Sequence, residues 1–222
     1  MRKSRAESQR RDRSQFRPDG WLRAQGRWFL SQSEKLSSRI ALIHRSLTSN
    51  HLPEDSRVDA AVGLMIVEHG RDLETLLIQR AERDGDPWSA QIGLPGGRSK
   101  VSDRSIKGTV EREVAEEVGI DLSKVGRELG PLPVGQPMRR SEMRVQPWVY
   151  LLSDKPPIII GAEVRSAFWT SINHLPSSIS TTDVYIRDGW RTVECFMVDG
   201  KVVWGYTYRV LNGFLQLPGV IE

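Results

Sequence analysis

The sequence predicts a mixed α/β (α+β) sheet domain that follows an N-terminal helical extension. Short apolar segments of strand character stand before, between and after only a few helical segments, which argues against a doubly wound sheet. The 222 residues, of which 38% are hydrophobic, suffice for one substantial core. No apolar run approaches the roughly 20 residues that a bilayer-spanning helix needs, so we expect no membrane segment.

Basic residues are concentrated in the N-terminal part of the chain. Residues 1–57 hold thirteen Lys and Arg against six Asp and Glu, a net charge of +7, whereas the remaining residues hold 19 against 22. We expect residues 1–30 to form a basic, disordered arm without a dedicated partner. Glu7, Asp12 and the lack of an apolar centre speak against a nucleic-acid contact or an organellar presequence.

Residues 31–57 are expected to form an amphipathic helix and a linker. Ser31 and Glu34 have the spacing of a capping box, in which each side chain closes a free backbone N–H. We interpret residues 32–48 as one helix, which ends near Asn50. Its apolar stripe has to pack either on the body of the chain or on a second subunit, which would make the protein a homodimer. The stripe consists of residues at helical spacing, namely Leu36, Ile40, Ile43 and Leu47.

The body, residues 58–222, is expected to be one domain of strands and two helices. A helix is predicted at about 104–118, between turn signals, and a closing helix at 205–217. The pair Asp199-Gly200 indicates a tight hairpin turn. Strands are predicted at 61–67, 75–78, 145–152, 165–170, 183–187, 192–198 and 201–204.

The composition limits the chemistry that the chain can perform. Cys195 is the only cysteine and cannot close an intramolecular disulfide, so we expect a reducing, cytoplasmic compartment. The four histidines are scattered and offer no zinc-ligand spacing. Catalysis would therefore have to come from carboxylates and basic side chains.

The helix predicted at 104–118 carries a cluster of acids. With Glu113 set to zero, Glu116 and Glu117 fall at about −60° and +40° around the helix axis, so three carboxylates share an arc of about 100°. Such crowding of like charges disfavours a helix, and a Mg²⁺ ion would relieve it, because Mg²⁺ prefers oxygen ligands.

The alternative interpretation is a solvated acidic face, tempered by pairing of Arg112 with Glu116 four residues later. Two neighbouring features favour the metal site over that alternative. Asp103 adds a further carboxylate before the helix. The double glycine Gly96-Gly97 lets the backbone approach a phosphate or a metal closely.

Residues 97–120 resemble the Nudix box, whose pattern is G-x5-E-x7-R-E-U-x-E-E-x-G-U, with U a bulky aliphatic residue. The acidic residue six positions after Gly97 is Asp103 in place of Glu, and the spacing from Gly97 to Arg112 is one residue longer than the pattern. In both respects, and in Thr109, the segment resembles the coenzyme A diphosphatase branch of the family. All terminal elements of the box are present, as Arg112, Glu113, Val114, Glu116, Glu117, Gly119 and Ile120.

Three segments outside the box extend the resemblance to that branch. They are residues 90–97 (AQIGLPGG), 141–149 (SEMRVQPWV) and 203–207 (VWGYT). Trp88 and Ala90 depart from the branch, which usually has histidine and glycine at those positions. The match covers about residues 58–217.

The resemblance implies a Nudix fold, in which a mixed sheet is sandwiched between helices. It also implies a Nudix pyrophosphohydrolase that cleaves the diphosphate linkage of a nucleoside diphosphate derivative. Coenzyme A or acyl-CoA is the first substrate candidate, and ADP-ribose or a dinucleotide is the second. A non-catalytic Nudix-fold module that senses a nucleotide is the alternative, and we expect no nucleic-acid partner.

The resemblance further implies the cofactor and the roles of individual residues. Mg²⁺ or Mn²⁺ would be held by Glu113, Glu116, Glu117 and the carbonyl of Gly97. The catalytic residues would be Arg112, which orients the carboxylates, together with Glu116 and Glu117, either of which could accept a proton from water. For contacts with the substrate phosphates we expect Gly96, Gly97, Arg80 and Arg98.

Overall fold

The computed structural model describes residues 36–49, 58–86, 88–186 and 189–221. The basic arm, the capping box predicted at Ser31 and Glu34, and the linker at 50–57 lie outside the described residues. In the part of the chain that is described, no helix has both the length and the apolarity to cross a bilayer.

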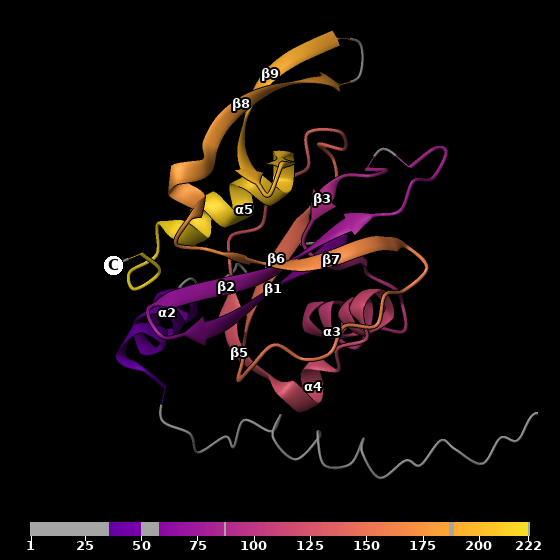
Figure 1. The fold of residues 1–222 in the computed structure, drawn as a ribbon. Coiled ribbons are helices and arrows are strands. Elements are labelled where there is room, and N and C mark those ends of the chain that lie inside the picture. The colour runs from indigo at the N-terminus through magenta and orange to yellow at the C-terminus, as the bar shows by residue number, and fades with distance from the viewer. Residues whose placement is uncertain (1–35, 50–57, 87, 187–188, 222) are drawn as a thin grey trace, which may run out of the picture.

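A seven-stranded mixed sheet forms the centre of the body (Figure 1). Its strands are β1 (Ala60–His69), β2 (Asp72–Arg80), β3 (Ile92–Gly93), β4 (Gly96–Arg98), β5 (Gly126–Pro131), β6 (Val145–Leu152) and β7 (Val164–Ser171). The strand order is β3-β2-β1-β6-β5, with β4 also paired to β1 and β7 to β2. β1 and β6 run parallel, whereas the other pairs are antiparallel. The predicted mixed sheet is therefore confirmed.

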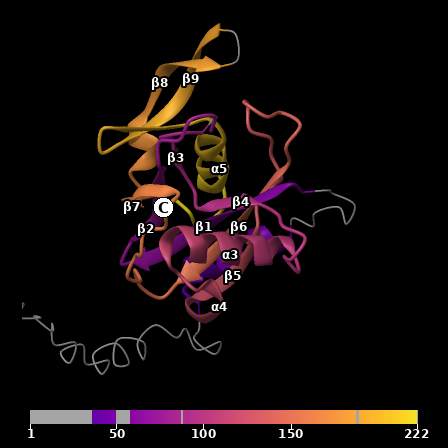
Figure 2. The ribbon, with the colours of Figure 1, turned by 90° about the vertical axis from the view of Figure 1, so that its right-hand side faces the viewer.

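Helices cover both faces of this sheet. They are α2 (Ser38–Thr48), α3 (Ile106–Val118), the short α4 (Leu122–Val125) and α5 (Gly205–Leu215). Because successive strand residues point to opposite faces, Leu64 and Ile66 of β1 pack in the layer of α2 and α5, and Met65 and Val67 pack in the layer of α3. Figure 2 shows α3 and α5 on opposite sides of the strands. The sheet is sandwiched between helices, as predicted.

Three further strands form a separate antiparallel sheet. They are β8 (Ile179–Ile186), which follows the 3₁₀ turn η1 (Leu175–Ser178), β9 (Gly189–Val198) and β10 (Lys201–Trp204). β8 and β9 project from the body as a long hairpin (Figures 1 and 2). The predicted turn at Asp199 and Gly200 is confirmed, with φ values of 47° and 73°.

The N-terminal helix is shorter than predicted and packs on the body. α2 begins at Ser38, because Ser37 caps it by accepting a hydrogen bond from the backbone N–H of Ile40 at 3.1 Å. Leu36 precedes the helix but still contacts the same core. Ile43 and Leu47 are fully buried there. The apolar stripe is thus covered by the chain's own core, and the homodimer stays a prediction.

Candidate active site

The helix α3 carries the predicted acids and is fixed at both ends. Ser105 caps its start by accepting a hydrogen bond from the backbone N–H of Gly108 at 3.0 Å. Gly119 ends the helix with a φ of 71°, a left-handed conformation that glycine adopts without strain. The side of α3 that faces the sheet is fully buried through Val110, Val114 and Val118. This burial sets the rotation of α3 and hence the direction of each acid.

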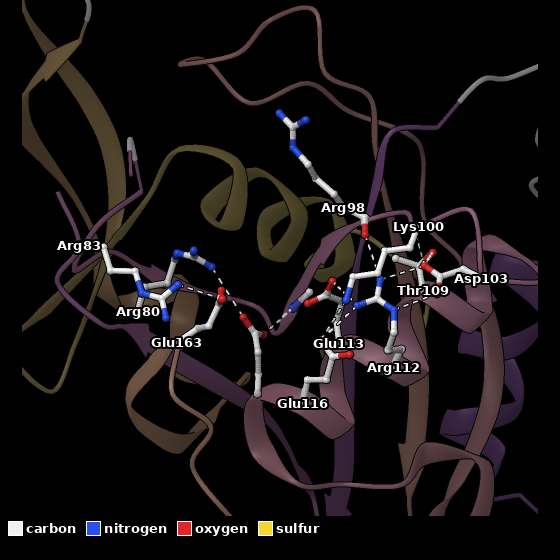
Figure 3. A network of polar contacts seen from close by, with 12 residues as sticks. Arg80, Arg83, Arg98, Lys100, Asp103, Thr109, Arg112, Glu113, Glu116 and Glu163 are labelled. Carbon is white, nitrogen blue, oxygen red and sulfur yellow. Dashed lines mark hydrogen bonds and ion pairs between the residues drawn. The ribbon is translucent and has the colours of Figure 1, made fainter. Parts of the chain in front are cut away.

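Arg112 connects the acids of α3 to the preceding loop (Figure 3). Its Nε and Nη2 donate to the two carboxylate oxygens of Asp103, at 2.8 and 2.9 Å. Its Nη1 donates to Glu113 at 2.6 Å and lies 3.3 Å from an oxygen of Glu116. Its Nη2 also donates to the carbonyl oxygen of Arg98, at 3.0 Å. The predicted pairing of Arg112 with Glu116 is present, but the shorter and doubled contact is with Asp103.

Asp103 organises the loop before α3. Besides Arg112, it accepts hydrogen bonds from the Thr109 hydroxyl and the Lys100 backbone N–H, each at 2.9 Å. The Arg112 guanidinium and these donors hold the pKa of the Asp103 carboxyl well below its usual range, although burial opposes them. Asp103 is therefore charged at neutral pH and anchors Arg112. The motif located this residue, but its partnership with Arg112 emerges only in the folded chain.

Glu117 lies apart from Arg112 and is buried, with 3% of its surface exposed. Its Oε2 accepts a hydrogen bond from the backbone N–H of Gly96 at 2.8 Å, and its Oε1 lies 3.7 Å from Nη1 of Arg80. Burial raises the pKa of Glu117 to about 7, with Glu113 and Glu163 adding to the rise, while Gly96 and Arg80 oppose it. The site thus contains a carboxylate that is costly to ionise when no cation is bound.

Gly97 lets Glu113 lie against the backbone of β4. A Cβ atom at Gly97 would stand 2.6 Å from the carboxylate carbon of Glu113, too close for any other residue type without movement. β4 is held in place by its pairing with β1, where Gly97 faces Ala61. The double glycine was expected to let the backbone approach a phosphate or a metal, and that stays a prediction; in the structure the side chain that lies against Gly97 is that of Glu113.

A cavity of about 330 Å³ opens beside these residues. All four predicted phosphate contacts line it together with Glu113, namely Arg80, Gly96, Gly97 and Arg98. Arg98 contributes an exposed side chain that extends away from the acids, while its carbonyl oxygen holds Arg112 (Figure 3). The predicted residues Arg112, Glu116 and Glu117 lie behind or beside the cavity, and they do not line it.

Two further carboxylates, which the sequence did not single out, line the cavity. Asp86 accepts hydrogen bonds from Nε and Nη2 of Arg80, at 3.2 and 2.9 Å. Glu163 pairs with Arg83 at 2.9 Å. Glu163 lies at the end of the segment between β6 and β7, which packs against the end of α3, where the Gly161 N–H donates to the carbonyl oxygen of Glu117 at 2.9 Å. No local pattern marks Glu163, because it pairs with Arg83 from a distant segment, whereas Asp86 pairs with Arg80, which lies six residues earlier in the chain.

The site offers ligands that suit a hard divalent cation. Glu113, Glu116 and Glu117 supply carboxylate oxygens, and Glu117 is buried away from water. Among the described residues, however, no three acidic, His or Cys side chains converge closely enough to enclose an ion. Nη1 of Arg112 lies between Glu113 and Glu116, and Glu117 faces Gly96. The Glu116 side chain is 52% exposed, which leaves it room to turn.

Comparison with known proteins identifies relatives of this chain. A model of the NUDIX domain matches residues 56–187. The chain is 35% identical over 98 residues to the uncharacterized Nudix hydrolase NudL of Pectobacterium atrosepticum, which covers 44% of this chain and 50% of that protein. It is 55% identical over 49 residues to an uncharacterized protein of Schizosaccharomyces pombe, covering 22% of this chain and 15% of that protein. The chain thus matches half or less of the length of these relatives.

Solved structures with a similar arrangement include a MutT/nudix family protein from Enterococcus faecalis. It is 17% identical with a TM-score of 0.45, and the alignment covers 84% of this chain and 79% of that chain. Another is the NUDIX domain of Shewanella oneidensis NrtR complexed with ADP ribose, which is 22% identical with a TM-score of 0.41. That alignment covers 60% of this chain and 86% of that chain.

Proposed function

The chain belongs to the Nudix family, and from that premise we propose that it hydrolyses the diphosphate linkage of a nucleoside diphosphate derivative with the aid of a divalent cation. The observation that carries this proposal is the network around Arg112, which joins Asp103, Glu113 and Glu116 beside a cavity of about 330 Å³. The carboxylates of this network suit a divalent cation, and the arginines that line the cavity suit phosphate groups. A substrate whose phosphates bind together with a cation fits both features.

We assign the roles as the family resemblance implies. Glu113, Glu116, Glu117 and the Gly97 carbonyl would hold Mg²⁺ or Mn²⁺. When bound, such an ion neutralises phosphate charge and lowers the pKa of a coordinated water. Arg112 positions Glu113 and Glu116 through its Nη1. Glu116 or Glu117 would accept the proton of the attacking water, while substrate phosphates would meet the cavity wall at Arg80, Gly96, Gly97 and Arg98.

Coenzyme A or acyl-CoA is our first candidate substrate. The three segments that resemble the coenzyme A diphosphatase branch contribute to the wall of one cavity, through residues such as Ile92, Met143, Val145 and Tyr206. Ala90, which stands where that branch usually has glycine, has a φ of 60°. Glycine adopts this left-handed conformation without strain, which agrees with a preference for glycine there, and alanine adopts it at a modest cost in strain.

A substrate panel with the purified full chain tests the proposal. We expect Mg²⁺-dependent cleavage of coenzyme A into phosphopantetheine and adenosine 3′,5′-bisphosphate, measured by chromatography of the phosphate products. ADP-ribose and a dinucleotide are tested as alternative substrates. If they are cleaved and coenzyme A is not, the general reaction is supported but coenzyme A is not the substrate.

Substitutions on α3 sharpen this test. Glu116→Gln and Glu117→Gln should each lower the rate by about a hundredfold or more, as removal of a group that acts mainly in the transition state does. Glu111→Gln is the matched control on the same helix, because Glu111 pairs with Lys107 away from the cavity. Binding of nucleotides without hydrolysis of any diphosphate would instead favour the non-catalytic sensing module.

A further inference from the structure

The strand β8 forms the outer edge of the three-stranded sheet. The strand order is β10-β9-β8, and among the described residues no further strand pairs with β8. Figure 1 shows β8 and β9 projecting from the body as a hairpin. β8 has eight residues, and an open edge of this length offers unpaired backbone N–H and C=O groups to another strand.

The backbone groups of alternate residues of β8 point away from β9. The carbonyl oxygen of Tyr185 accepts a hydrogen bond from Nη2 of Arg139 at 3.1 Å, so this carbonyl points outward. Because backbone groups alternate in direction along a regular antiparallel strand, those of Ile179, Thr181 and Asp183 point outward as well. A carbonyl oxygen has two lone pairs, so the contact with Arg139 leaves Tyr185 able to accept a second hydrogen bond.

Apolar side chains stand at both ends of this edge. Ile179, at the start of β8, is 51% exposed, and Tyr185, near its end, is 52% exposed. Tyr185 contacts Trp190 of β9, which is 68% exposed, and the two rings meet edge to face with their centres 5.7 Å apart. Exposed aromatic side chains that pack against one another are typical of protein interfaces.

The edge lacks the residues that commonly keep two copies of an edge strand apart. Residues 179–186 have the sequence ISTTDVYI, which contains neither lysine nor proline. Their only charged residue is Asp183, whose Oδ1 accepts a hydrogen bond from the Thr192 hydroxyl at 2.6 Å. A second copy of β8 can therefore pair with this edge, provided that Asp183 does not meet a like charge.

Charge decides how two such edges align. When the outward backbone groups face each other in antiparallel pairing, two registers pair seven residues of each strand. One pairs residues 180–186 with themselves and sets Asp183 against the partner's Asp183, and like charges directly opposite repel. The other pairs residues 179–185 with themselves around Thr182. It sets Asp183 against the partner's Thr181, whose hydroxyl is a hydrogen-bond donor. The second register is therefore favoured.

We propose that the chain forms a symmetric homodimer in which the β8 edges of two copies pair antiparallel, with Thr182 on the twofold axis. The two three-stranded sheets would join into one continuous sheet. At each end of the interface, Ile179 would pack against the partner's Tyr185, an aromatic and β-branched pair that stabilises neighbouring strands. This interface is separate from α2, whose apolar stripe is covered by the core of the same chain.

Cysteine cross-linking of the full chain tests the register. Thr182→Cys should give a disulfide-linked dimer after mild oxidation, because a residue on the axis faces its own copy in a pair with Cα atoms about 4.5 Å apart. Ser180→Cys and Val184→Cys are matched controls, since each residue would lie about 13 Å from its own copy. Each alone should give at least tenfold less dimer, whereas a mixture of the two should cross-link. The natural Cys195 is buried, and the unaltered chain measures its background.

Light scattering at increasing protein concentration tests whether the dimer forms without a cross-link. The natural chain should reach twice the mass of one chain. Ile179→Lys and Tyr185→Lys should each raise the dissociation constant of the dimer about tenfold or more, because each sets a charge against an apolar side chain of the partner. Leu42→Lys is the matched control, since Leu42 is an exposed apolar residue of α2, and it should leave the dissociation constant unchanged.

Several outcomes would overturn the proposal. A chain that stays monomeric at every concentration would do so, as would a dimer that Thr182→Cys does not cross-link or that Leu42→Lys dissociates. A monomer that sediments with vesicles of anionic phospholipid, and no longer does so after Trp190→Ser, would assign the exposed aromatic pair to a membrane surface instead. None of these measurements involves a substrate, so their results do not depend on the proposed function.

Discussion

The burial of Glu117 should make the metal-free protein less stable as the pH rises toward neutrality. Its pKa is raised from an ordinary value of 4.5 to about 7 by burial. The folded state therefore holds this proton more tightly than the unfolded state does. Below pH 4.5 both states are protonated and Glu117 has no effect on the balance. Between pH 4.5 and 7 only the unfolded state ionises, so the free energy of unfolding falls, and above pH 7 the loss is complete.

The size of this effect follows from the displacement of the pKa. Each tenfold change in an ionisation constant corresponds to about 1.4 kcal/mol, so a rise from 4.5 to about 7 amounts to roughly 3 kcal/mol. Glu117→Gln carries no charge at any pH and still offers an acceptor to the N–H of Gly96. The stability of this variant relative to the natural chain should therefore increase by roughly 3 kcal/mol between pH 4.5 and pH 8.

Urea unfolding in EDTA, followed by tryptophan fluorescence at several pH values, measures this difference. Glu116→Gln is the matched control, because Glu116 lies next to Glu117 on the same helix and its side chain is 52% exposed. A difference between Glu117→Gln and the natural chain that does not change with pH would refute the reasoning, since it would mean that Glu117 ionises as readily in the folded state as in the unfolded state.

Three further predictions concern other parts of the structure. Asp103→Asn should lower the free energy of unfolding in urea by about 3 kcal/mol at pH 7, because it breaks a buried pair with Arg112. Since the folded-state pKa of Asp103 is lowered, this loss of stability should shrink as the pH falls below 3.8. A loss that stays the same at low pH would contradict the pairing. Gly97→Ala should displace Glu113 and weaken Mn²⁺ binding roughly tenfold in EPR titrations, with little change in melting temperature; unaltered Mn²⁺ affinity would remove Glu113 from the cation site. Leu47→Ala should destabilise the chain by about 3 kcal/mol in urea, and a loss below about 1 kcal/mol would mean that α2 does not belong to the core.

Elements with strong local signals were predicted well. β6 and β10 have the predicted bounds, and α3 differs by two residues at its start, where the cap of Ser105 decides the boundary. Val110, Val114 and Val118 stand at helical spacing and are buried together. These features depend on residues a few positions apart, so their pattern is visible without the fold.

Elements that depend on a distant partner were missed or misjudged. β5 has the sequence GRELGP, which offers little strand character, and it forms because β6 supplies a complementary edge. α2 was predicted to begin six residues too early, because the capping pattern at Ser31 resembles the functional cap at Ser37. The four strand residues Ile179–Thr182 were also not predicted, and their pairing with β9 explains their conformation.

The chain by itself determined that three glutamates share one edge of a helix, that a double glycine precedes them, and that Arg112 stands among them, because a helix fixes the angles between its residues wherever it lies. Only the tertiary structure decided that Glu117 is buried while Glu116 remains exposed, and that Asp86 and Glu163 line the same cavity as Glu113. Burial and charge at a site depend on which distant segments pack against it, and those contacts form only when the whole chain has folded.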